Sequence, residues 1–131
     1  MKKILQTVQI NLYNCNVDSI SSEEFVRNFL KKLVGFIGMN RIPSKLVKSK
    51  NPLSFDFKSE AVKKDPNESG VTGLIILYES HCAVHTWPSD DFERFACVVI
   101  SSCKEYSAEA TFNFCKAAFE STDGEWKEVK M

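Results

Sequence analysis

The chain has 131 residues, with 17 basic and 17 acidic side chains, so its formal net charge is zero. This balance argues against nucleic acid and against an anionic membrane surface as partners. No apolar run approaches the ~18 residues that a membrane-spanning helix needs. Polar residues (Gln6, Gln9 and Asn11) interrupt the apolar start that an export signal requires.

Five cysteines, an odd number without a CxxC pair, argue against a disulfide framework and a structural zinc site. The length fits a single domain, 1–131. We therefore expect a soluble protein of the reducing cytoplasm.

The amino-terminal part predicts a strand followed by a helix. Residues 4–14 alternate between apolar and polar side chains, as a half-buried strand does. A helix is expected over 22–37, because Ser21 and Glu24 have the spacing of a capping box and aromatic and aliphatic residues follow at helical spacing. Gly38 suits the end of this helix.

The segment 41–70 contains three prolines and many lysines, and predicts a long mobile loop with at most a brief strand around Leu53, Phe55 and Phe57. After it, Val71 to Trp87 reads as an apolar strand interrupted by reactive side chains.

Phe95 to Cys103 predicts another strand, a second helix starts near Ser107, and a turn at 121–124 leads into a short final segment. This order favours an α+β fold: a two-layer sandwich in which an antiparallel sheet carries two helices on one face.

Both histidines lie in the string Glu79-Ser80-His81-Cys82-Ala83-Val84-His85-Thr86-Trp87-Pro88. A metal site is disfavoured because the nearby cysteines lack a characteristic spacing. A hydrolytic triad is disfavoured because no GxSxG elbow is present. From chemistry alone, the simplest interpretation is that the histidines and Ser80 are structural residues of a strand.

Residues 70–88, GVTGLIILYESHCAVHTWP, resemble the signature of the small prokaryotic S-adenosylmethionine decarboxylase proenzyme family. The similarity extends to the strand that ends in Leu12-Tyr13-Asn14-Cys15 and to the later strand that ends in Cys103. The resemblance implies a self-cleaving protein, cut between Glu79 and Ser80 into an amino-terminal β chain (1–79) and a carboxyl-terminal α chain (80–131).

In this family the serine hydroxyl attacks the preceding carbonyl, and elimination and hydrolysis then leave a pyruvoyl group, the cofactor that Ser80 would supply. The family's processing base falls on His85. Its assisting hydroxyl falls on Thr72, which is equally consistent with a strand-forming residue.

The pyruvoyl carbonyl forms a Schiff base with the substrate amine and serves as electron sink. The resemblance assigns the proton donor to Cys103; Cys97 as donor, or Cys103 as a packed hydrophobe, stays open. Cys82 is expected to be a packing residue.

Trp87 either stacks on a purine or packs at the end of a strand. The family's glutamate for ribose hydroxyls falls on Ser89, so Asp90 either substitutes for it or belongs to a solvated loop.

The leading hypothesis is S-adenosylmethionine decarboxylation in spermidine synthesis. Two alternatives stay open: a pyruvoyl decarboxylase of ornithine, arginine or another amino acid, and an uncleaved, non-catalytic homologue that binds or regulates another protein. The resemblance further implies a homodimer of cleaved protomers, with active sites near the interface.

Overall fold

The computed structural model describes residues 4–40, 56–60 and 70–131 as a two-layer α+β sandwich. The elements in chain order are β1 Gln6–Tyr13, α1 Val17–Ile20, α2 Glu23–Phe36, β2 Asp56–Glu60, β3 Gly70–Ile76, β4 Ser80–Trp87, the short 3-10 helix η3 Asp90–Phe92, β5 Phe95–Ser102, α3 Ala108–Ala118 and β6 Asp123–Lys130.

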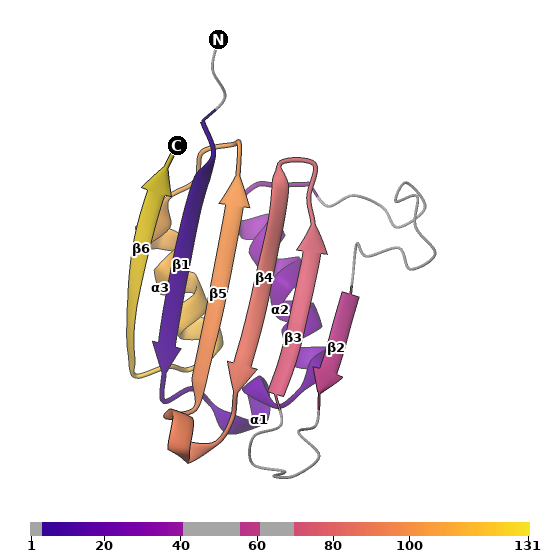
Figure 1. The fold of residues 1–131 in the computed structure, drawn as a ribbon, viewed down its shortest axis with the longest axis vertical. Helices are drawn as coiled ribbons and strands as arrows, with labels where there is room; N and C mark the ends of the chain where they lie inside the picture. Colours follow the sequence, from indigo (N-terminus) through magenta and orange to yellow (C-terminus); the bar gives the residue numbers. More distant parts are fainter. Residues whose placement is uncertain (1–3, 41–55, 61–69) are drawn as a thin grey trace.

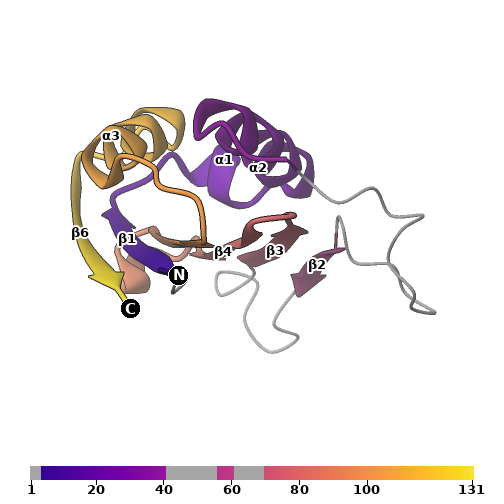
Figure 2. The ribbon, with the colours of Figure 1, turned by 90° about the horizontal axis from the view of Figure 1, so that it is seen from above.

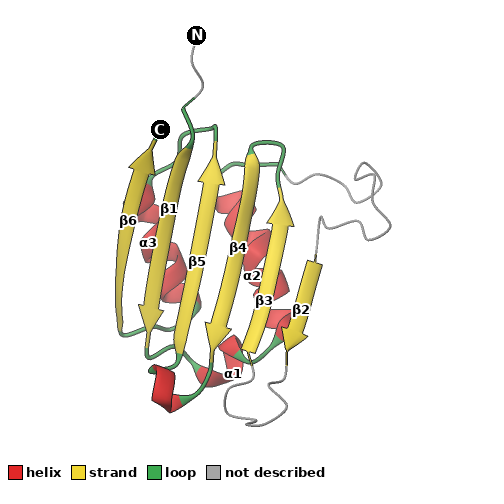
Figure 3. Ribbon diagram, in the orientation of Figure 1, coloured by secondary structure: helices red, strands yellow, loops and turns green. Residues whose placement is uncertain are grey.

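The strands form one six-stranded sheet in the order β2-β3-β4-β5-β1-β6, with every neighbouring pair antiparallel. Figures 1 and 3 show the strands side by side with the helices behind them, and Figure 2 shows all three α-helices on one side of the sheet. The predicted fold class is therefore confirmed. In the described part of the chain, no helix is long and apolar enough to cross a membrane.

The helix expected over 22–37 is α2, but its cap differs from the prediction. The Ser22 hydroxyl, not that of Ser21, accepts a hydrogen bond from the Phe25 backbone N–H at 3.1 Å. The position that a capping box reserves for a carboxylate is thus Phe25. At the other end, Gly38 has φ of 71° and Met39 N–H donates to Val34 C=O at 3.0 Å, which closes the helix as a Schellman motif.

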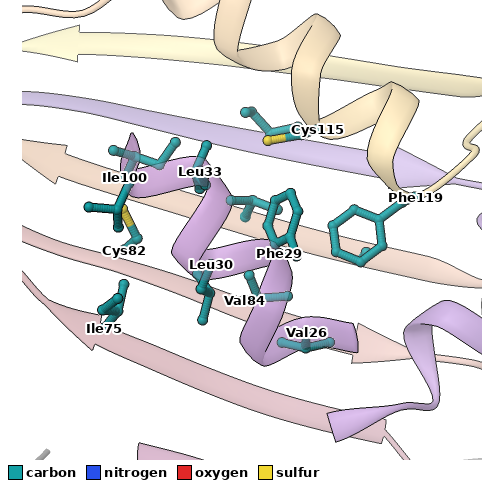
Figure 4. Close-up of a cluster of buried hydrophobic side chains, with 14 of the residues drawn as sticks. Val26, Phe29, Leu30, Leu33, Ile75, Cys82, Val84, Ile100, Cys115 and Phe119 are labelled. Carbon is teal, nitrogen blue, oxygen red and sulfur yellow. The ribbon is translucent and has the colours of Figure 1, made fainter. Parts of the chain in front are cut away.

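The core lies between the helices and the sheet (Figure 4). Phe119 at the end of α3 is fully buried, and its ring centre lies 4.6 Å from that of Phe29 on α2. Strand residues of one parity complete the core and belong to β1, β3, β4 and β5: Val8, Ile10, Leu12, Val71, Ile75, Cys82, Val84, Ala96, Val98 and Ile100. The alternation that predicted β1 thus reflects one face packed on helices and one face left open.

The open face carries residues of the other parity, arranged in rows across the strands. One row contains Thr72, His85, Cys97 and Asn11, each the register partner of the next. Two positions away a second row contains Leu74, Ala83, Val99 and Gln9, and beyond it a third contains Ile76, His81, Ser101 and Thr7. Both histidines therefore lie on the face that no helix covers.

The segment Val71 to Trp87, expected to be one interrupted strand, is two strands joined by a tight turn at Tyr78 and Glu79. The reactive residues interrupt the apolar pattern because the chain reverses there. The loop expected over 41–70 falls mostly outside the described residues. Within it, β2 pairs Phe57 with Gly73, whereas Leu53 and Phe55 are not described.

Candidate functional site

The turn between β3 and β4 is closed by its own hydrogen bond and is held by the segment that follows α2. Leu77 N–H donates to Ser80 C=O at 2.9 Å, which closes the turn, and Tyr78 N–H donates to Asn40 C=O at 2.9 Å. The Glu79 carboxylate accepts from Asn40 twice, from the backbone N–H at 3.0 Å and from the side-chain amide at 3.4 Å. Asn40 therefore fixes the two turn residues, Tyr78 and Glu79, that precede Ser80.

The electrostatic environment favours the ionised form of Glu79. Burial pushes the pKa of this carboxyl upward, but the Asn40 hydrogen bonds and the charge of Lys104 together bring the pKa below its ordinary value. Lys104 is itself anchored, because its ammonium donates to Gly38 C=O at 2.5 Å. Three segments of the chain thus meet at this turn: the end of α2, the β3–β4 connection and the residues after β5.

The carbonyl of Glu79 accepts a hydrogen bond from the backbone N–H of Cys103 at 3.0 Å. This donor polarises the carbonyl, and it lies where charge would develop if a nucleophile attacked the carbonyl carbon. Ser80 follows directly with φ of 154°, a backbone conformation that L-residues seldom adopt and that costs on the order of 1–3 kcal/mol. The Glu79 carbonyl is therefore polarised, and the backbone strain lies at Ser80, directly after it.

The Ser80 hydroxyl contacts a histidine that the sequence analysis left unassigned. Ser80 Oγ lies 3.1 Å from Nδ1 of His81, the next residue in β4. Both side chains are half-buried.

At the other end of β4, His85 contacts Thr72 rather than Ser80. His85 Nδ1 lies 3.2 Å from Thr72 Oγ1, across the β3–β4 pair in which the two residues are register partners. Five positions of extended strand separate His85 from Ser80, roughly 16 Å at the ordinary rise of a strand. The residues expected to process Ser80 are thus brought together in one pair, Thr72 with His85, but that pair is far from Ser80 of the same chain.

The two thiols considered as proton donor lie at opposite ends of the sheet. Cys103 is exposed and follows Ser102, the register partner of Ser80. Cys97 is half-buried, and its register partner is His85; burial raises the pKa of its thiol. Within one chain, only Cys103 lies beside the Glu79–Ser80 bond.

Two other residues of the motif, Cys82 and Thr86, are buried and have structural roles. Cys82 is fully buried among the core residues, as expected, and burial raises its pKa to about 12. Thr86 is also buried: its hydroxyl donates to Ile20 C=O at 2.7 Å and accepts from Val71 N–H at 2.8 Å. Thr86 therefore ties β4 to β3 and to α1.

Trp87 and Asp90 lie at the His85 end. The Trp87 ring is 37% exposed and its centre lies 5.2 Å from that of Phe95, so it packs at the strand end while leaving part of its surface open. The Asp90 side chain is 95% exposed and pairs with Arg94 at 3.7 Å. Ser89, which the resemblance aligns with a glutamate, accepts from Asp91 N–H at 3.1 Å and caps η3. Asp90 in the single chain is thus a solvated residue.

Sequence reasoning did not identify Asn40 or His81 as site residues. Asn40 is separated from Glu79 by almost forty positions, and no local pattern pairs them. His81 is part of the string Glu79-Ser80-His81-Cys82, but neighbouring residues of a strand ordinarily point to opposite faces, so the sequence did not predict that its Nδ1 lies 3.1 Å from Ser80 Oγ. No group of three or more metal-ligating side chains occurs in the ranges 4–40, 56–60 and 70–131.

Comparison with known proteins shows which family the chain resembles. A family model described as S-adenosylmethionine decarboxylase matches residues 6–130. S-adenosylmethionine decarboxylase proenzymes are among the similar proteins: that of Clostridium botulinum strain Hall is 28% identical over 94 residues (72% of this chain and 66% of that protein). The proenzyme of Hydrogenobaculum is 31% identical over 97 residues (74% of this chain and 58% of that protein). The aligned regions thus span about two thirds or less of these relatives' lengths.

The fold is shared with a crystal structure of the adenosylmethionine decarboxylase from Aquifex aeolicus. That similarity has a TM-score of 0.73 at 19% identity and covers 98% of this chain and 91% of the other. The low identity limits this comparison to the fold. Because the family model covers almost the whole chain, the protein belongs to the S-adenosylmethionine decarboxylase family.

Proposed function

We propose that this protein is a pyruvoyl-dependent S-adenosylmethionine decarboxylase that cuts itself between Glu79 and Ser80. The observation that carries the proposal is the hydrogen bond from Cys103 N–H to the carbonyl of Glu79. It supplies a donor to the oxygen that becomes negatively charged when the Ser80 hydroxyl attacks. The unusual φ of Ser80 adds strain that cleavage relieves.

The residues present fit the formation of a pyruvoyl group from Ser80. Attack by Oγ converts the peptide bond into an ester. Removal of the Ser80 Cα proton then expels the α-carboxylate of Glu79 and leaves dehydroalanine, which water hydrolyses to the pyruvoyl group with release of ammonia. Asn40, through its two hydrogen bonds, stabilises the side chain of the residue that leaves. The pyruvoyl carbonyl supplies an electron sink for decarboxylation. Cys103, exposed beside this position, is our proposed proton donor to the product.

The separation of His85 from Ser80 is the reason to propose a homodimer. His85 and Thr72 lie on the uncovered face of the sheet, at the opposite end of β4 from Ser80. If two copies pack these faces together about a two-fold axis that runs across the strands, each β4 is reversed relative to the other. His85 of one copy then lies over the Ser80 end of its partner.

Such packing matches known geometry. Two sheets pack face to face at ~10 Å, a separation that side chains bridge, and two-fold dimers are the commonest assemblies. The middle row of the open face, with Leu74, Ala83 and Val99, provides the apolar centre that such an interface needs. We therefore propose that His85 removes the Cα proton of the partner's Ser80, with Thr72 orienting the imidazole through their 3.2 Å contact.

The substrate we propose is S-adenosylmethionine, and the product is an aminopropyl donor for spermidine synthesis in the cytoplasm. The names of the similar proteins support this substrate over ornithine or arginine, and over a non-catalytic binding role. Trp87 and Asp90 are proposed substrate contacts at the His85 end, where the exposed ring surface of Trp87 offers a stacking platform.

The test is the intact mass of freshly purified protein under denaturing conditions, followed by carbon dioxide release from labelled S-adenosylmethionine, ornithine and arginine. The proposal predicts fragments 1–79 and 80–131, the latter with a blocked amino terminus, and release from S-adenosylmethionine alone. A single chain after prolonged incubation would contradict self-cleavage. Fragments with release only from an amino acid would contradict the substrate.

A further inference from the structure

Self-cleavage needs a proton acceptor for the Ser80 hydroxyl, and this acceptor must lie within hydrogen-bond reach. His85 of the same chain does not, because it contacts Thr72 at the far end of β4. His81 does: its Nδ1 lies 3.1 Å from Ser80 Oγ. The contact is made inside one chain, on one strand, and needs no second copy.

We propose that His81 is the base that activates Ser80 for ester formation, the first step of self-cleavage, while His85 acts only on the later elimination. This assignment rests on the proposed function, because it describes the same cleavage. It divides the two histidines of the motif between two proton transfers, one from oxygen and one from carbon.

The step balances with the atoms present. The Oγ–H proton of Ser80 passes to His81 Nδ1 as Oγ bonds to the carbonyl carbon of Glu79. The oxyanion that forms is held by Cys103 N–H, which already donates to this oxygen at 3.0 Å. The C–N bond then breaks, and the proton on His81 passes to the departing Ser80 nitrogen. The result is an isomer of the chain with an ester in place of an amide, and no other reactant is consumed.

The other polar side chains around the Glu79–Ser80 bond already make hydrogen bonds that leave them unsuited to accept the Ser80 hydroxyl proton. The Glu79 carboxylate accepts two hydrogen bonds from Asn40, and a carboxyl whose pKa is lowered is a weaker base. The Ser102 hydroxyl donates to Lys104 C=O and accepts from Lys104 N–H. The Lys104 ammonium donates to Gly38 C=O. Among the described side chains at this turn, His81 alone pairs a basic nitrogen with Ser80 Oγ.

The experiment follows H81Q and H85Q chains from synthesis, with denaturing mass spectrometry and hydroxylamine treatment. Glutamine keeps a polar side chain of similar reach but removes the basic nitrogen. Hydroxylamine cuts an ester and leaves an amide intact, so it separates a chain stalled before ester formation from one stalled after it. H81N is a second variant, and a cooperative thermal transition for each confirms that it is folded.

The assignment predicts that H81Q is cleaved at least ~100-fold more slowly than wild type, the lower end of what a general base contributes, and that it stays resistant to hydroxylamine. H85Q should instead accumulate a chain that hydroxylamine cuts between Glu79 and Ser80.

Cleavage of folded H81Q and H81N at the wild-type rate would overturn the assignment alone, as would a hydroxylamine-sensitive H81Q. A wild-type chain that stays an uncut, hydroxylamine-resistant amide would overturn the proposed function together with it.

Discussion

The two ends of β4 carry different sets of polar side chains. At the end where β4 begins, Ser80 and His81 are in contact, and the Glu79 carbonyl accepts from Cys103 N–H. At the end where β4 finishes, His85 pairs with Thr72 and the exposed ring of Trp87 follows. The first end carries the peptide bond that we propose is cut and, in His81, a nitrogen within reach of the Ser80 hydroxyl. The second end carries a histidine in contact with a hydroxyl, far from that bond.

Residues that are close in sequence can thus lie far apart in space when they belong to one extended strand. The motif places His85 five residues after Ser80, and in a helix such a spacing would leave the two side chains within about one and a half turns. In β4 the same spacing puts them at opposite ends of the sheet. The family motif is therefore compact in sequence, yet we propose that its parts meet only between two copies.

The largest effect is expected at Ser80. Ser80→Ala removes the Oγ that attacks the Glu79 carbonyl carbon in the proposed mechanism, and should therefore abolish cleavage completely. Intact mass after several days at 37 °C measures the result, with Ser19→Ala in the distant helix α1 as a matched control that should be cleaved as wild type. Cleavage of the Ser80→Ala chain at 79–80 would contradict the role of that end of β4.

The second-largest effect is expected at the two candidate proton donors, the thiols of Cys103 and Cys97. Cys103→Ala should still be cleaved, because its backbone N–H persists, but decarboxylation should fall by about 100-fold or more through loss of the proton donor. Cys97→Ala, at the His85 end, should retain most of its activity. Turnover of the cleaved forms of both variants is the measurement, and the reverse pattern would assign the donor to Cys97.

The smallest effect concerns the pH dependence of stability at the Ser80 end. Because the folded pKa of Glu79 lies below its ordinary value of about 4.3, ionised Glu79 stabilises the fold above that pH, and this stabilisation is lost as pH falls through the lowered pKa. In a Ser80→Ala background, Glu79→Gln should lower the free energy of unfolding at pH 7 by less than ~1 kcal/mol, since the site is largely solvated. Urea unfolding at pH 7 and pH 3 measures it, and an equal difference at both pH values would refute the electrostatic origin.

Most of the fold followed from local patterns in the sequence. Strict alternation gave β1, and the helical spacing with Gly38 gave α2 and its end. The hairpin turn at Tyr78 and Glu79 was missed because the residues carry no glycine, proline or asparagine, the usual signals of a tight turn. The turn is held instead by Asn40, a contact between distant segments.

The candidate site was only partly accessible to sequence reasoning. The resemblance pointed to Ser80, His85, Thr72 and Cys103, and the structure places Thr72 with His85 and Cys103 with the Glu79 carbonyl. It does not place the two pairs together. Neighbouring residues of a strand ordinarily point to opposite faces, so the 3.1 Å contact between Ser80 Oγ and His81 Nδ1 has no signal in the sequence.

The most direct test of the shared site is complementation between two inactive chains. H85Q keeps Ser80 but lacks the second histidine, and Ser80→Ala keeps His85 but lacks the nucleophile. The two are co-expressed with tags of different mass, and cleavage of each chain is followed by denaturing mass spectrometry. The account predicts that H85Q is cleaved between Glu79 and Ser80 when paired with Ser80→Ala and stays uncut alone. An H85Q chain that stays uncut in the mixed dimer, or that is cleaved equally well alone, would contradict it.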